Sequence, residues 1–206
     1  LPDPNKVRKV THYPSMPYQE VPSFIGELRQ REALSARLME FVILTACRQS
    51  EARLATYDEV DTDQRVWTIP ASRMKANREH RVPLTDRMLE IIDECRNDSV
   101  YLFAENGNPL SINALRMLMN RMGVGEYTPH GFRSSFRTWG ATNTQASSEA
   151  LEVALSHYSN SSIVSVYRRT DFLELRLEIL TKWHSFLIQH ISFHRIQSDR
   201  LCVVKT

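Results

Sequence analysis

Two apolar stripes with the period of an α-helix constrain the fold more than any other feature of the sequence. Apolar residues recur three and four positions apart, first at Val21, Phe24, Ile25 and Leu28 and then at Leu34, Leu38, Phe41, Val42 and Thr45. This spacing puts each set on one face of a helix, where it contributes to a buried core. Further helices are predicted over 48–55, after the N-cap Thr85, over 112–122 between Ser111 and Gly123, from Gly131 to about 142, over 149–155, and from Asp171 onward.

The period of the pattern changes after residue 56. Apolar residues at Tyr57, Val60, Val66, Trp67 and Ile69 flank a turn over 61–64 and predict a β-hairpin. Residues 72–75 are expected to pair with 80–82 across a tip at 76–79, and residues 106–109 predict another turn. The predicted fold class is therefore mainly α with a small antiparallel β-sheet (α+β).

Residues suited to phosphate chemistry gather between Thr128 and Arg169. His130 and Arg133 are three apart and share one face of a predicted helix, His157 ends a later helix, and Tyr167 follows ten residues after it. A tyrosine hydroxyl has a pKa of about 10, so only about one in a thousand is ionised near pH 7 and a base must take its proton. Charge developing on a phosphodiester is best met by arginine forks, with histidines nearby.

Two basic residues upstream complete this set. Arg48 follows an apolar run, with Glu51 one helical turn further on, and supplies a second guanidinium. Lys75 lies beside the predicted hairpin tip and is a candidate to donate a proton to the leaving oxygen of the phosphodiester. Arg73 and Arg78 are rivals for this role. Each of these residues taken alone is more simply a solvated or structural side chain, so the hypothesis depends on the whole set.

Arg48, Lys75, His130, Arg133, His157 and Tyr167, in that order, resemble the active-site signature of the tyrosine recombinases, the phage-type integrases. The resemblance runs from about residue 14 to about 187 and includes Thr45 and Glu51 around the first arginine. It implies the tyrosine recombinase catalytic-domain fold. One departure is Ala46-Cys47, where members of the group commonly carry glycine or small residues, and altered packing is expected there.

The resemblance also implies a mechanism. Arg48 and Arg133 would clamp the scissile phosphate, His130 would accept the proton of Tyr167, His157 would hydrogen-bond a phosphate oxygen, and Lys75 would protonate the leaving 5′-oxygen. Tyr167 would form a 3′-phosphotyrosine, and no cofactor and no metal would be needed. The expected function is a site-specific DNA recombinase that integrates or excises a prophage or mobile island. Alternatives are a type IB topoisomerase-like DNA-relaxing enzyme and a non-catalytic DNA-binding remnant.

Pattern and composition suggest three parts. Residues 1–16, rich in proline and lysine or arginine, are expected to be an interdomain linker, residues 17–190 the catalytic domain, and residues 191–206 a C-terminal tail. In the family such a linker follows an amino-terminal domain, so the sequence is expected to be a piece of a longer protein. His190 and His194 could bind a metal, but no third ligand is placed by spacing, and a solvated tail is favoured.

Charge and cysteine content give the remaining expectations. A net charge of +2 does not by itself indicate a nucleic-acid partner, but basic residues cluster at 73–81, 116–137 and 168–169, which indicates one basic face. Double-stranded DNA and self-association into a tetramer on it are expected, without a small-molecule substrate. No apolar run approaches the length of a membrane span, and three scattered cysteines predict reduced thiols in a cytoplasmic protein.

Overall fold

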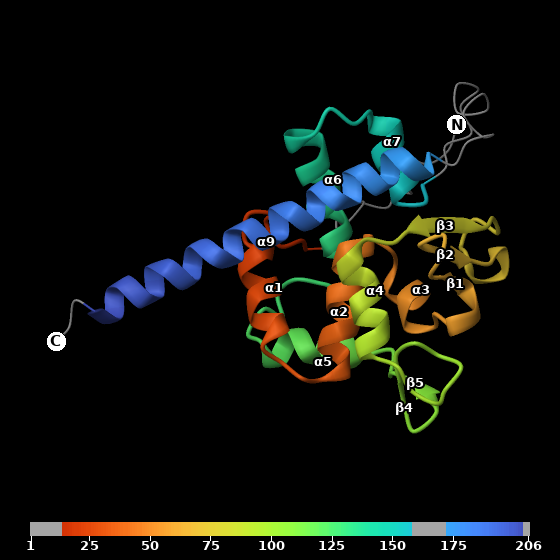
Figure 1. The fold of residues 1–206 in the computed structure, drawn as a ribbon, viewed down its shortest axis with the longest axis horizontal. Helices are drawn as coiled ribbons and strands as arrows, with labels where there is room; N and C mark the ends of the chain where they lie inside the picture. The colour runs from red at the N-terminus through yellow and green to blue at the C-terminus, as the bar shows by residue number, and fades with distance from the viewer. Residues whose placement is uncertain (1–13, 158–171, 204–206) are drawn as a thin grey trace, which may run out of the picture.

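The computed structural model describes residues 14–157 and 172–203, with side chains up to residue 189 (Figure 1). Its helices are α1 (Val21–Arg29), α2 (Leu34–Thr45), α3 (Gln49–Arg53), α4 (Asp86–Glu94), α5 (Ala114–Arg121), α6 (Gly131–Asn143), α7 (Ser148–Ala154) and α9 (Leu173–Val203), and its strands are β1 (Val60–Asp61), β2 (Val66–Ile69), β3 (His80–Pro83), β4 (Ala104–Glu105) and β5 (Asn108–Pro109). Helices predominate and the strands pair antiparallel, which confirms the predicted fold class.

Helix α2 is the centre of the molecule. It contacts α1, α4, α5, α6 and α9, and Figure 1 shows these helices around it. Both predicted apolar stripes are buried, apart from the half-buried Leu34, but α2 is also buried on its remaining faces, where Ser35 and Glu40 lie. A helix enclosed on all sides is a core element and not a surface helix.

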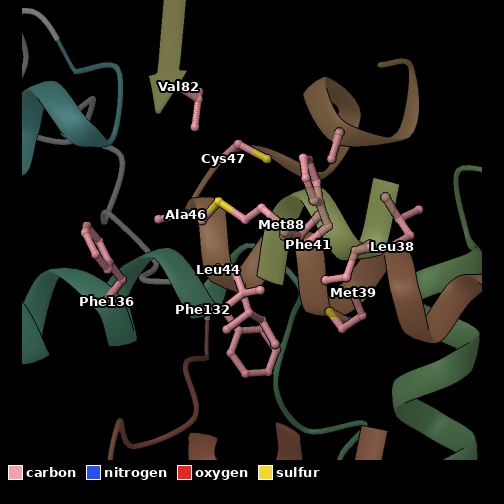
Figure 2. Close-up of a cluster of buried hydrophobic side chains, with 14 of the residues drawn as sticks. Leu38, Met39, Phe41, Leu44, Ala46, Cys47, Val82, Met88, Phe132 and Phe136 are labelled. Atoms are coloured by element: carbon pink, nitrogen blue, oxygen red, sulfur yellow. The ribbon is translucent and has the colours of Figure 1, made fainter. Parts of the chain in front are cut away.

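The buried side chains around α2 join the helices to the sheet. Figure 2 shows Leu38, Phe41 and Leu44 of α2 together with Met88 of α4 and Val82 of β3. The Phe41 ring lies 5.5 Å from Trp67 of β2 and 5.4 Å from Phe103, measured between ring centroids. The sheet is therefore attached to the same core as the helices.

Helix α9 is fixed to the body by an aromatic cluster. Trp183 lies 4.9 Å from Trp139 and 5.8 Å from Phe136, both on α6, and its indole nitrogen donates to the Ile43 carbonyl of α2 at 3.0 Å. Ile179 and Trp183 on this helix are buried. The backbone helix continues across residue 190 to Val203, and this last part projects from the body in Figure 1.

The sheet differs from the prediction in one strand. The hairpin of β1 and β2 forms as expected, with the strand order β1-β2-β3. However, β3 pairs with β2 in the register Ile69↔His80 and not with residues 72–75, so the predicted pairing of 72–75 is wrong. Residues Ala71–Arg73 form a 3-10 turn instead, because Arg73 donates to the carbonyl of Glu51 at 3.1 Å and to that of Leu54.

Most helix ends lie close to the predicted positions. Thr85 occupies the N-cap of α4, and Gly123, with φ +75°, follows the end of α5. Helix α5 begins at Ala114, two residues later than predicted, and α9 begins at Leu173, so Phe172 lies outside it; Asp171 is outside the described residues. No described helix is long and apolar enough to span a lipid bilayer.

Candidate active site

Arg48 is placed by the chain reversal between α2 and α3. Ala46 ends α2 in the left-handed conformation, with φ 51°, and Arg48 then precedes the first turn of α3. The buried carboxylate of Glu51 accepts from the Arg48 backbone N–H at 2.7 Å and from Arg48 Nη1 at 2.6 Å. Glu51 therefore holds both the backbone and the guanidinium of Arg48.

Arg133 lies in the first turn of α6 and is buried, with 4% of its surface exposed. Its Nη1 donates to the Ala46 carbonyl and its Nη2 to the Leu155 carbonyl, both at 2.5 Å. Its Nε–H has no hydrogen-bond partner, and no carboxylate pairs with the side chain, in the part of the chain that the structure describes. Burial, followed by the charge of Arg48, lowers the pKa of Arg133 to about 10, so the group is still protonated at neutral pH.

A single turn after α7 contacts both arginines. The Ser156 N–H donates to the Val153 carbonyl at 2.9 Å and the His157 N–H to the Glu152 carbonyl at 2.8 Å, and Ser156 has φ 52°. These two bonds and the left-handed residue make a Schellman motif. Its three residues bring the Leu155 carbonyl to Arg133, the Ser156 hydroxyl to within 2.7 Å of Arg48 Nη1, and His157 Nε2 to within 3.2 Å of Arg133 Nη2.

The two predicted histidines lie at the exposed side of this cluster. His130 directly precedes α6, and both histidines are solvent-exposed. Partial desolvation, then the charges of Arg133 and Arg48, lower the pKa of His130. The imidazole is therefore neutral near pH 7, which is the form a general base requires.

His80 adds a buried imidazole beside the arginines. Burial and the charges of Arg176, Arg133, Arg48 and Arg78 lower its pKa to about 3, so it is neutral at physiological pH. The sequence assigned it no role because its neighbours come from four separate segments of the chain.

Lys75 lies in an exposed turn before β3. Within the described ranges its side chain makes no hydrogen bond or ion pair. Its rival Arg73 is occupied by carbonyl contacts and by Glu59, 3.0 Å away, and is part of the scaffold of α3. Arg78 interacts electrostatically with His80 and stays a rival.

Several predicted features fall outside this geometry. Tyr167 lies outside the described residues, as do Tyr158 and the side chains of His190, His194 and Cys202. Cys47 and Cys95 are free and buried, and burial raises the pKa of each thiol to about 12. No group of metal-ligating side chains occurs among the described residues.

Sequence reasoning missed Ser156, Glu152 and Arg137. Glu152 Oε2 lies 2.9 Å from His157 Nδ1, and Glu152 Oε1 lies 2.7 Å from Arg137 Nε. A helix-ending turn brings residues five apart together, so the spacing of Glu152 and His157 was an available signal once such a turn was recognised. The contact of Ser156 with Arg48 spans 108 residues and had no local signal.

The sequence model of the phage integrase family, the tyrosine recombinases, matches residues 15–174. The chain belongs to this family. Among curated relatives of this integrase-family chain, the prophage integrase IntA of Escherichia coli K12 is 31% identical over 180 residues, covering 82% of the chain and 43% of that protein. The integrase of Shigella phage Sf6 is 27% identical over 201 residues, covering 93% of the chain and 52% of that protein. The integrase-family chain thus spans about half the length of these relatives.

Solved structures show the same fold. A lambda integrase tetramer bound to a Holliday junction is similar with a TM-score of 0.58 at 17% identity, over 76% of this chain and 49% of that one. The XerH recombinase bound to its difH substrate gives 0.58 at 17% identity, over 74% and 50%. The lambda integrase catalytic core gives 0.53 at 14% identity, over 73% of this chain and 95% of that one. The integrase-family chain therefore has the tyrosine recombinase catalytic-domain fold.

Proposed function

We propose that this integrase-family chain is the catalytic domain of a site-specific DNA recombinase that breaks and rejoins strands through a 3′-phosphotyrosine. One observation carries the proposal: Arg133 is buried and charged, but among the described residues its hydrogen bonds go only to carbonyl groups and an imidazole, and no carboxylate forms an ion pair with it. A buried charge without a counter-charge is costly unless an anion completes the site. A phosphate supplies that anion.

The second arginine fits the same proposal. The Arg48 charge acts on Arg133, and both side chains are held by the turn at Leu155 and Ser156. Glu51 neutralises one side of Arg48 and fixes the direction of its guanidinium. Two guanidinium groups that are positioned before substrate binds can stabilise the charge that develops on the non-bridging oxygens as the phosphorus is attacked.

The proposed chemistry assigns a proton path. Neutral His130 accepts the Tyr167 proton while the phenolate oxygen forms a bond to phosphorus. The bond from phosphorus to the 5′-oxygen breaks, and Lys75, in its exposed turn, gives that oxygen its proton. His157 donates to a non-bridging oxygen. Attack by a 5′-hydroxyl on the phosphotyrosine reverses these steps and joins the strands.

The partners are proposed from the relatives. Double-stranded DNA is the substrate and a tetramer is the assembly, in line with the lambda integrase tetramer on a Holliday junction. Integration or excision of a prophage or mobile island is the biological reaction, in line with the prophage integrases among the relatives. The domain limits proposed are a linker over 1–16, a catalytic domain over 17–190 and a tail over 191–206, and a cytoplasmic location follows from DNA as substrate.

A nicked duplex with a randomised core tests the proposal. Cleavage beside a nick releases a short fragment and traps the covalent adduct, which is recovered after denaturation and sequenced. The chain should form the adduct, Tyr167→Phe should abolish it while DNA binding persists, and Arg133→Gln should slow it on the order of 100-fold. Arg96→Gln is the matched control, because Arg96 is exposed and pairs only with the exposed Asp93 among charged groups of the described chain.

The other outcomes separate the alternatives. Absence of any adduct with wild type, combined with DNA binding that falls steeply with salt, would make the chain a DNA-binding remnant. Relaxation of supercoiled plasmids without strand exchange between the recovered sites would make it a topoisomerase. An adduct that persists in Tyr167→Phe would remove Tyr167 from the mechanism.

A further inference from the structure

Three side chains form a chain of contacts that ends at His157. Arg137 Nε lies 2.7 Å from Glu152 Oε1, Glu152 Oε2 lies 2.9 Å from His157 Nδ1, and His157 Nε2 lies 3.2 Å from Arg133 Nη2. Arg137 also donates to the Ser148 hydroxyl at 2.8 Å, which fixes it against the start of α7. The Glu152 carboxylate is therefore held at Oε1 by Arg137 of α6 and at Oε2 by His157 of the turn after α7.

The neighbours of His157 determine which nitrogen carries its proton. A guanidinium has only donors, so Arg133 must donate to the lone pair of Nε2. The neutral imidazole is then the Nδ1–H tautomer, and Nδ1 donates to Glu152. Partial burial opposes ionisation of Glu152, but hydrogen bonds from Arg137 and His157 outweigh it and hold the carboxyl pKa below its ordinary value, so the acceptor is charged.

A phosphate oxygen that takes the place of Arg133 Nη2 at His157 Nε2 needs a proton on that nitrogen. His157 can donate from Nε2 to a phosphate oxygen, while Nδ1 still donates to the carboxylate, only as the doubly protonated imidazolium. A carboxylate at Nδ1 accepts the proton of that nitrogen and fixes the ring plane, as in other pairs of a carboxylate and a histidine.

We propose that Glu152, held by Arg137, is a positioning residue that keeps His157 oriented with Nε2 toward the scissile phosphate. This inference rests on the proposed function for its catalytic consequence. The tautomer in the free protein is independent of that function. Among the described residues, the charged and titratable groups around the ring are Arg133 and Arg137 from α6, Glu152 from α7, and Arg48 and His130 nearby.

The first experiment reads the tautomer directly. Imidazole nitrogen shifts of the 15N-labelled chain are recorded above pH 8, and the His157 signals are assigned by their loss in His157→Gln. Wild type should show the Nδ1–H tautomer, and Glu152→Ala should shift His157 toward the Nε2–H form. Glu149→Ala is the control, because Glu149 is an exposed residue of the same helix outside the site, and it should leave the tautomer unchanged. A wild-type Nε2–H form, or no change in Glu152→Ala, would overturn the proposal.

The second experiment reads the catalytic effect on the nicked duplex. Glu152→Ala should slow single-turnover cleavage about tenfold, the loss equivalent to one hydrogen bond to a charged group, with DNA affinity within about twofold of wild type. Arg137→Gln should give a smaller change in the same direction.

The two experiments test the proposed function and the role of Glu152 separately. If wild type makes no adduct, the proposed function fails, and the tautomer measurement still decides the orientation of His157. If wild type cleaves and Glu152→Ala cleaves equally fast, the role of Glu152 is refuted while the proposed function stands.

Discussion

Ser156 occupies a backbone conformation that usually belongs to glycine. Two helices of the chain end in the same hydrogen-bond pattern: after α5 the left-handed residue is Gly123, and after α7 it is Ser156, with φ values of 75° and 52°. A side chain in this region costs roughly 1 kcal/mol. The serine hydroxyl contacts Arg48, whereas a Cβ on Gly123 would meet nothing within 4 Å. Strained residues of this kind tend to occur at functional sites.

Two replacements of Ser156 separate conformation from chemistry. Ser156→Ala loses the bond to Arg48 and should lower the free energy of unfolding by about 1 kcal/mol. Ser156→Gly loses the same bond but relieves the backbone and should be more stable than the alanine variant by about 1 kcal/mol. Both should slow cleavage of the nicked duplex by roughly tenfold. Urea unfolding measures the stabilities, with Gly123→Ala as the reference for the purely conformational cost.

If the glycine variant cleaves as fast as wild type, the hydroxyl has no part in holding Arg48. If the alanine and glycine variants are equally stable, the left-handed conformation of Ser156 is not strained.

Ala46 is the other strained residue beside the site. It ends α2 at φ 51°, and the departure of Ala46-Cys47 from the family pattern thus coincides with a position that favours glycine. Ala46→Gly should raise the free energy of unfolding by up to about 1 kcal/mol, because the Arg133 contact uses the Ala46 carbonyl and survives. Ala36→Gly, within α2, should instead lower it by about 1 kcal/mol or more. Thermal unfolding compares the two, and a destabilised Ala46→Gly would contradict the interpretation.

At the scale of elements, the parts that the sequence predicted are those with local causes. The stripe of α1, the position of α4 after Thr85 and the stop at Gly123 each depend on neighbouring residues. The turn at Ala71–Arg73 was predicted as a strand because the cause of the turn is remote: Arg73 reaches the carbonyls of α3.

The same distinction applies to the site. Residue types and order identified Arg48, His130, Arg133 and His157, which the structure brings together around one turn. The contacts that orient them cross between distant segments, and no periodicity encodes those contacts.

Helix α6 meets the segment before α1 at Gly131. A Cβ on Gly131 would lie 2.3 Å from the Pro14 carbonyl oxygen and 2.8 Å from Ser15 Cα, which are backbone atoms. Gly131→Ala should therefore push this segment away and lower the free energy of unfolding by about 1–3 kcal/mol, and it should slow cleavage because His130 is adjacent. Gly140→Ala is the control in the same helix, since its Cβ would meet a movable Leu151 side chain at 2.5 Å. Urea unfolding of both variants is the measurement, and equal stabilities would show that the backbone approach is not tight.

At the scale of the molecule, positive charge is concentrated where four segments meet. Arg48, Arg133, Arg176 and Arg78 all act on His80, and only Glu51 among the described carboxylates hydrogen-bonds Arg48. The helices and sheet enclose this charge with the α2 core behind it. An anion bound at this site would stabilise the folded chain, since a ligand that binds only the folded state stabilises it.

The buried His80 makes the stability of the whole molecule dependent on pH. Its pKa is about 3 in the folded chain and 6.5 as the ordinary value, so the unfolded chain binds the proton first as pH falls. The stabilisation is complete above about pH 6.5 and is lost toward pH 3, which amounts to about 2 kcal/mol by pH 5.

His80→Gln should flatten the dependence of unfolding free energy on pH between 7.5 and 5 by about this amount, whatever its effect at pH 7.5. Carboxyl groups with lowered pKa values, such as Glu40, bind their protons at more acidic pH. The change in unfolding free energy between pH 7.5 and 5 therefore comes from the histidines. His184→Gln, at a half-buried histidine whose pKa is also lowered, should flatten the curve less. Urea unfolding at a series of pH values measures this dependence. If the slope of unfolding free energy against pH is the same in His80→Gln as in wild type, His80 takes up its proton without unfolding.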